Sequence, residues 1–269
     1  VVIADSLALR VDLVFNNYQN LDGGVLLLGL VYFSFQIYCD FSGYSDIAIG
    51  TSKLFGFELM SNFKFPYFSR DIGEFWRRWH ISLSTWFRDY LYIPLGGSKK
   101  SKWLSLRNIL IIFLVSGFWH GANWTFVMWG LIHAALYIPL FLSGKNRLNI
   151  SNIVAKDRFL PNLKELFQIG VTFLSVMTAW VFFRSESISN AFHYLIRLII
   201  EFGIPSINRG GVIFLFPFVI FEWIIRFDER NPINIRTKLT RWLIYILISY
   251  LVVAYFEIID IDQFIYFQF

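Results

Sequence analysis

Long, uninterrupted apolar stretches constrain this chain more than any other feature of its sequence. They cover residues 24–38, 108–119, 122–142, 166–183, 211–226 and 242–258. A bilayer core accommodates a helix of about 20 apolar residues, and lipid tolerates only helices and closed barrels, because no water is present there to satisfy backbone groups. Since the stretches do not alternate between apolar and polar residues, they favour helices over a barrel. The stretch 108–119 is too short to cross the membrane alone.

Composition supports a membrane location. Hydrophobic residues make up 56% of the chain and charged residues 16%, whereas soluble domains are about 45–50% apolar and about 25% charged. The net charge of +5 would suit a nucleic acid, but the basic residues gather in the gaps between apolar stretches, as the positive-inside rule requires. We therefore predict an all-α, polytopic integral membrane protein whose partner is a lipid bilayer and not a nucleic acid.

The charges of the loops predict a topology. Loops 143–165 and 226–241 are basic, loop 184–210 is nearly balanced, and the tail after residue 256 is acidic. Placing both basic loops in the cytoplasm puts the balanced loop and the tail outside. The basic segment 99–107 then also lies in the cytoplasm.

No internal repeat or linker divides the chain, so residues 1–269 are predicted to form a single transmembrane domain. Because the chain begins at Val1 without Met, we expect it to lack the N-terminal helices of a longer protein. Cys39 is the only cysteine, which leaves no disulfide within the chain.

The segment S-G-F-W-H-G-A-N-W at residues 116–124 places a histidine, His120, between two apolar stretches. Gly117 and Gly121 flank it and permit a break in the helix. An ionisable residue at membrane depth is a functional candidate, and histidine is the side chain best suited to proton transfer near neutral pH. The alternative is a neutral histidine bonded to a carbonyl at a helix end. Another histidine within an apolar stretch, His133, is interpreted as a satisfied core residue.

Residues 70–97 contain His80 in a predicted continuous helix that is rich in charge and tryptophan. Its candidate substrate-binding residues are Arg77, Arg78 and Arg88. Arg77 and Arg88 are 11 residues apart and would share one face of a helix, and Glu74 has the spacing to pair with Arg77 or Arg78. The alternative is an interfacial amphipathic helix anchored by its tryptophans, with snorkelling arginines.

A third polar segment, residues 38–50, follows directly on the first apolar stretch. Its candidate substrate-binding residues are Asp40, Ser42, Tyr44 and Asp46. These side chains are expected to bind a polar substrate or to pair with the arginines above. A helix cap at Ser45 or Asp46 is an equally good interpretation. No metal site is predicted, since no carboxylate stands at a recognisable ligand spacing from His80 and His120.

Four strings occur in an order that resembles the membrane-bound O-acyltransferase (MBOAT) family. They are C-D-F-S-G-Y-S-D at 39–46, F-W-R-R-W-H at 75–80, R-D-Y-L-Y-I-P-L-G-G at 88–97 and G-F-W-H-G at 117–121. The ending F-I-Y-F-Q-F at 264–269 is similar to that of the branch that acetylates alginate. The resemblance implies a ring of tilted helices around a central tunnel, with His120 as the catalytic histidine and His80 as the second recurrent one.

The resemblance also implies a reaction. It is O-acyl transfer, most simply of an acetyl group, from a cytoplasmic thioester to a hydroxyl of a polysaccharide or carrier protein outside. The donor is acetyl-coenzyme A or another acyl thioester, no cofactor is bound, and an extracytoplasmic acetyltransferase is the expected partner protein in a bacterial inner membrane. His120 would act as the base, while His80, Asn123 or Trp124 would donate hydrogen bonds to the thioester oxygen.

Other readings stay open. Peptidoglycan O-acetylation and D-alanyl transfer are variants of the same chemistry. A transporter whose histidines line a pathway and a non-catalytic membrane scaffold are the alternatives from other classes.

Overall fold

The computed structural model describes residues 2–98, 101–150, 152–230, 235 and 237–255. Their ten α-helices are α1 (Ala4–Asn16), α2 (Gly23–Leu54), α3 (Ile72–Arg78), α4 (Ile81–Phe87), α5 (Lys102–His120), α6 (Trp124–Leu142), α7 (Leu163–Arg184), α8 (Ile188–Ile200), α9 (Val212–Ile225) and α10 (Lys238–Ala254). No strand occurs among these residues. Short 3-10 turns lie at Tyr18–Asn20, Pro66–Phe68 and Arg209–Gly211. The predicted all-α fold class is confirmed.

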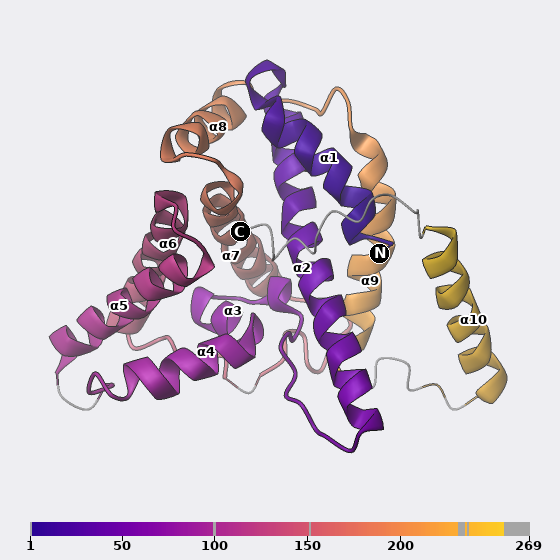
Figure 1. The fold of residues 1–269 in the computed structure, drawn as a ribbon, viewed down its shortest axis with the longest axis horizontal. Coiled ribbons are helices and arrows are strands. Elements are labelled where there is room, and N and C mark those ends of the chain that lie inside the picture. Colours follow the sequence, from indigo (N-terminus) through magenta and orange to yellow (C-terminus); the bar gives the residue numbers. More distant parts are fainter. Residues whose placement is uncertain (1, 99–100, 151, 231–234, 236, 256–269) are drawn as a thin grey trace.

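The chain is a multi-pass membrane protein. Within the described residues, α2, α5, α6 and α7 are each long and apolar enough to cross a membrane. In Figure 1, α2 and α7 occupy the middle, the α5–α6 pair lies on one side, and α9 and α10 lie on the other. The predicted ring around a tunnel stays a prediction. Part of the basic segment 99–107 (Lys99 and Lys100), the acidic tail and the ending 264–269 lie outside the described residues.

Helix α2 corrects the predicted end of the first apolar stretch. The helix begins after Asp22, whose side chain accepts a hydrogen bond from Val25 N (2.8 Å). It does not end near Tyr38 but continues to Leu54, so that the whole helix is 32 residues long. The reason is that Phe41 and Ser45 keep one face buried beyond that point. The cap predicted at Ser45 or Asp46 is therefore wrong, since both lie inside the helix.

Two segments outside the predicted apolar stretches are also helical. In residues 4–16, Leu7, Val11 and Val14 recur at helical spacing and are fully buried in α1. Gly29 of α2 lets α1 approach, because a Cβ there would lie 2.5 Å from a Val14 methyl. The loop 184–210 contains α8, whose Ala191 and Tyr194 are buried.

Helices α5 and α6 form a tight pair. The stretch 108–119 was predicted to be short, but α5 starts six residues earlier, after Ser101 caps it by accepting from Leu104 N (3.2 Å). A Cβ added at Gly130 of α6 would lie 2.1 Å from the Phe113 carbonyl oxygen of α5. The glycine therefore permits the two backbones to approach closely, as small residues do between membrane helices.

The segment around His80 is not one helix, as was predicted. Helix α3 ends at Arg78, His80 adopts a left-handed conformation (φ 44°), and α4 starts at Ile81. A five-residue π turn, Arg88–Tyr92, follows α4. The break has a tertiary cause, because Lys64 N donates to the Arg78 carbonyl and Ile81 N donates to the Asn62 carbonyl (both 3.0 Å). The predicted shared helical face of Arg77 and Arg88 is thus wrong.

Candidate active site

His120 is the last residue of α5 and is half-buried where three helices meet. Its ring packs edge-on against Trp129 of α6 and Phe183 of α7, with ring centroids 5.1 Å away in both cases. The ring of its neighbour Trp119 lies 4.9 Å away. An imidazole held among aromatic rings is favoured in its neutral form, which is the form a general base requires.

His80 lies at the break between α3 and α4 and is only 7% exposed. Its Nδ1 is 3.3 Å from Asn62 Oδ1, and the same oxygen accepts from the Ser82 N–H (3.1 Å) and hydroxyl (2.9 Å). An amide oxygen only accepts, so the neutral ring carries its proton on Nδ1. A non-glycine residue held in the left-handed region is typical of functional sites.

The two predicted histidines meet at one aromatic cluster. The rings of His80 and Trp119 are 6.1 Å apart, and Trp119 is in turn the immediate neighbour of His120. The tertiary structure therefore places together two histidines that are 40 residues apart in the sequence.

Helix α2 contacts this cluster through the aromatic ring of Phe41 and the hydroxyl of Ser45. Phe41 packs edge-on against the His80 ring at 4.7 Å, and Ser45 Oγ accepts from Asn62 Nδ2 at 3.3 Å. The predicted residues of this segment lie on α2 too: Asp40 and Ser42 are half-buried, and Tyr44 and Asp46 are exposed. Their proposed substrate contacts stay a prediction.

The site contains residues that sequence reasoning missed. Asn62, Ser82, Trp129 and Phe183 orient or enclose the two histidines. None of them stands within three residues of His120, and an asparagine in a loop has no pattern that marks it as a partner of a distant ring. Only the fold shows these contacts.

Asn123 and Trp124 begin α6, directly after the His120 turn. Asn123 caps the helix by accepting from Thr125 N (3.1 Å), and its Nδ2 donates to the Glu186 carbonyl (2.9 Å). Trp124 is 73% exposed. The amide of Asn123 thus ties α6 to the start of α8, and its predicted role toward a thioester oxygen stays a prediction.

The arginines of the second segment differ in their partners. Arg78 Nη2 pairs with Glu74 at 2.7 Å, as its spacing predicted. Arg77 instead donates to the carbonyls of Asn146 (2.9 Å) and Asn149 (3.4 Å). Arg88 makes two hydrogen bonds to its neighbour Asp89, and these lower the pKa of the Asp89 carboxyl.

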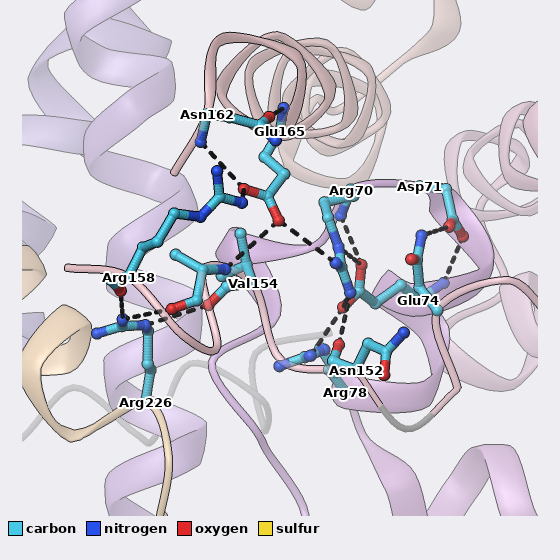
Figure 2. A network of polar contacts seen from close by, with 12 residues as sticks. Arg70, Asp71, Glu74, Arg78, Asn152, Val154, Arg158, Asn162, Glu165 and Arg226 are labelled. Atoms are coloured by element: carbon cyan, nitrogen blue, oxygen red, sulfur yellow. Dashed lines mark hydrogen bonds and ion pairs between the residues drawn. The ribbon is translucent and has the colours of Figure 1, made fainter. Parts of the chain in front are cut away.

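A buried polar network fixes the base of this segment (Figure 2). Glu74 has no exposed surface, and it binds Arg70 at 3.0 Å as well as Arg78. Arg70 also lies 3.8 Å from Glu165 at the start of α7. Arg226, which follows α9, donates to the carbonyls of Val154, Ala155 and Arg158. The network joins α3, α7, α9 and the loop 143–162, and we interpret it as structural.

A cavity of about 680 Å³ opens between α3, α4, α5, α6 and the loop 143–150. Its lining includes Arg77, Arg88 and Arg147, with no acidic side chain among the lining residues that the structure describes. The rest of the lining is mainly apolar and aromatic. The cavity also reaches Ser116, which precedes His120 by one turn of α5. Such a pocket fits a ligand with an anionic head and an uncharged end that approaches His120.

Among the residues that the structure describes, no group of three or more histidine, cysteine, aspartate or glutamate side chains could hold a metal ion.

Comparisons with known proteins match this chain to one family. Residues 24–178 match the family described as MBOAT, membrane-bound O-acyltransferase family. A probable alginate O-acetylase AlgI of Pseudomonas aeruginosa is 42% identical over 215 residues, which cover 79% of this chain and 39% of that protein. A peptidoglycan O-acetyltransferase of Helicobacter pylori is 40% identical over 196 residues, 72% of this chain and 35% of that protein.

A teichoic acid D-alanyltransferase of Streptococcus thermophilus is 35% identical over 168 residues, which cover 58% of this chain and 40% of that protein. The chain thus spans about two fifths of the length of these relatives. The match of residues 24–178 includes both histidines and all the candidate site residues named from the sequence.

Proposed function

Because this chain belongs to the membrane-bound O-acyltransferase family, we propose that it supplies the acyl-transfer site of a membrane O-acetyltransferase. The observation that carries the proposal is the meeting of His80 and His120 on either side of Trp119. The cavity lined by arginines also reaches Ser116 of α5, one helical turn before His120. A proton acceptor and a donor pocket therefore lie near one another.

The reaction joins an acetyl group to a hydroxyl. As the hydroxyl oxygen attacks the thioester carbonyl, its proton passes to His120, the carbon–sulfur bond breaks, and the thiolate leaves. Asn62 holds the His80 proton on Nδ1, which leaves Nε2 of His80 as a hydrogen-bond acceptor, while the single proton of the attacking hydroxyl goes to His120. The aromatic walls limit water and thus hydrolysis of the thioester.

The donor is proposed to be acetyl-coenzyme A or another acyl thioester with a phosphate-bearing carrier. Arginine is suited to phosphate because its planar guanidinium offers paired donors. Arg88 and Arg147 line the cavity, and the basic loop 143–165 beside it supports a cavity mouth on the cytoplasmic face of a bacterial inner membrane.

The acceptor is proposed to be an extracytoplasmic polysaccharide, of the kind that the name of the alginate relative indicates. A carrier protein or a periplasmic acetyltransferase partner is proposed to receive or pass on the group. Peptidoglycan is the second candidate acceptor, favoured by the Helicobacter relative.

The test compares O-acetyl groups on extracellular polymers in cells that carry the full-length protein with His120→Ala or with His193→Ala. His193 is an exposed histidine of α8 and serves as the matched control. Loss of a general base lowers rates by about 10²–10⁴-fold. At equal membrane abundance, we expect acetyl esters to be lost in His120→Ala and kept in His193→Ala. Unchanged acetylation in His120→Ala would move support to a non-catalytic scaffold.

A further inference from the structure

A third histidine, His133, lies in an aromatic box at the heart of the protein. It belongs to α6 and has no exposed surface. The rings of Trp129 and Trp76 stand edge-on to it at 4.8 and 4.9 Å, and Phe75 and Phe113 stack on it at 6.2 Å. Four aromatic side chains from three helices, α3, α5 and α6, therefore enclose one imidazole.

The ring nitrogens of this box lack a hydrogen-bond partner within the part of the chain that the structure describes. Neither ring nitrogen of His133 hydrogen-bonds to any residue that the structure describes. The same holds for the buried indole nitrogens of Trp76 and Trp129 within those residues. A phenylalanine would fill the space without the penalty of an unpaired imidazole, so packing alone does not explain a histidine here. Two indole donors beside an imidazole acceptor suit a buried water molecule.

The box stands between the candidate base and the cavity. Trp129 contacts both His133 (4.8 Å) and His120 (5.1 Å) through its ring. On the other side, Trp76 and Phe113 contact His133 and also line the cavity. One aromatic side chain therefore separates His133 from His120, and one separates it from the cavity. The proposed reaction must move a proton between these two places.

We propose that His133, acting through buried water, returns the proton of the reaction to the departing thiolate. This inference rests on the proposed acyl transfer. The acceptor hydroxyl loses its proton to His120 as the new carbon–oxygen bond forms. His120 passes that proton through water to His133, and the His133 imidazolium then gives a proton through water to the thiolate as the carbon–sulfur bond breaks. Both histidines end neutral, and the products are an ester and a thiol.

The chemistry of the leaving group explains why such a relay is useful. An alkyl thiol resembles cysteine, with a pKa of about 8.5, so its thiolate leaves more readily when a proton is supplied. A thiol of lower pKa leaves faster without that help. The relay is therefore needed for an alkyl thioester and dispensable for an activated aryl thioester.

The experiment measures acetyl transfer by the purified full-length protein from two donors, the acetyl thioesters of pantetheine and of 4-nitrothiophenol. The variants are His133→Phe, which keeps the packing, and His133→Gln, which keeps hydrogen bonding but cannot exchange a proton in this way. We expect both to lower the rate with the pantetheine donor by about 10²-fold and to change the rate with the aryl donor little. Ala134→Gly, at the neighbouring fully buried position, should affect both donors equally.

The outcomes separate the two proposals. The relay is overturned if the His133 variants lose transfer rate equally with both donors, or lose none with either donor. Acetyl transfer by the wild-type protein would still uphold the proposed function in both cases. If the wild-type protein transfers acetyl from neither thioester, the proposed function falls and the relay falls with it. His120→Ala serves as the reference, since loss of the base should lower the rate with both donors.

Discussion

Asn62 Oδ1 lies 3.3 Å from Nδ1 of His80 and thereby sets which nitrogen of that ring carries the proton. The same side chain also bonds Ser82 and Ser45, so it connects the break between α3 and α4 to helix α2. One amide thus controls the orientation of a histidine at the candidate site.

Replacing this amide should impair acyl transfer. We expect Asn62→Leu to lower kcat/KM by about 10–100-fold, as is found when the partner that orients a ligating histidine is lost. Asn62→Asp keeps the acceptor and should retain more activity. The measurement is acetyl transfer at matched protein level. An Asn62→Asp variant no better than Asn62→Leu would show that the acceptor oxygen has no such role.

Removing the buried carboxylate of Glu74 should destabilise the fold. Glu74→Gln removes the charged partner of Arg78 and leaves Arg70 with only the longer contact to Glu165, and breaking a buried pair costs about 3–5 kcal/mol. Thermal unfolding of the detergent-solubilised protein measures the effect. Glu201→Gln, in the exposed pair with Arg197, is the matched control and should change the stability little. Equal effects of the two variants would contradict a structural role for the network in Figure 2.

The arginines that line the cavity should strengthen the binding of a negatively charged acyl donor. Arg147→Ala is expected to raise KM for acetyl-coenzyme A several-fold with kcat nearly unchanged, because it removes attraction to phosphate that is equal in ground and transition states. The KM for a small thioester without phosphate should not change. Lys156→Ala, an exposed base that does not line the cavity, serves as the control. A KM unaffected by Arg147→Ala would remove this arginine from donor binding.

The close approach of α5 and α6 should depend on Gly130. A methyl group there would lie 2.1 Å from a backbone oxygen, so Gly130→Ala forces the helices apart, with a cost of about 1–3 kcal/mol. A Cβ added at Gly170 of α7 would meet no packing atom of the described residues within 4 Å, so Gly170→Ala should be neutral or should stabilise the helix by about 0.5–1 kcal/mol. Unfolding in detergent compares the two variants. Similar stabilities would contradict the tight packing.

Much of the architecture followed from the sequence because lipid imposes strong rules on composition. Apolar stretches had to become helices, and the predicted stretches at 122–142, 166–183 and 211–226 correspond to α6, α7 and α9. His120 stood out because an ionisable residue between two glycines at membrane depth needs a reason. These features depend on local residue type, so one sequence was sufficient to find them.

The tertiary structure decided the rest. The left-handed turn at His80 depends on hydrogen bonds that Asn62 accepts and Lys64 donates, which a helical spacing rule does not include. The meeting of His80, His120 and His133 around Trp119 and Trp129 likewise depends on how helices pack. Sequence patterns report what each segment prefers by itself, whereas a site made by several helices exists only after their side chains have filled a common core.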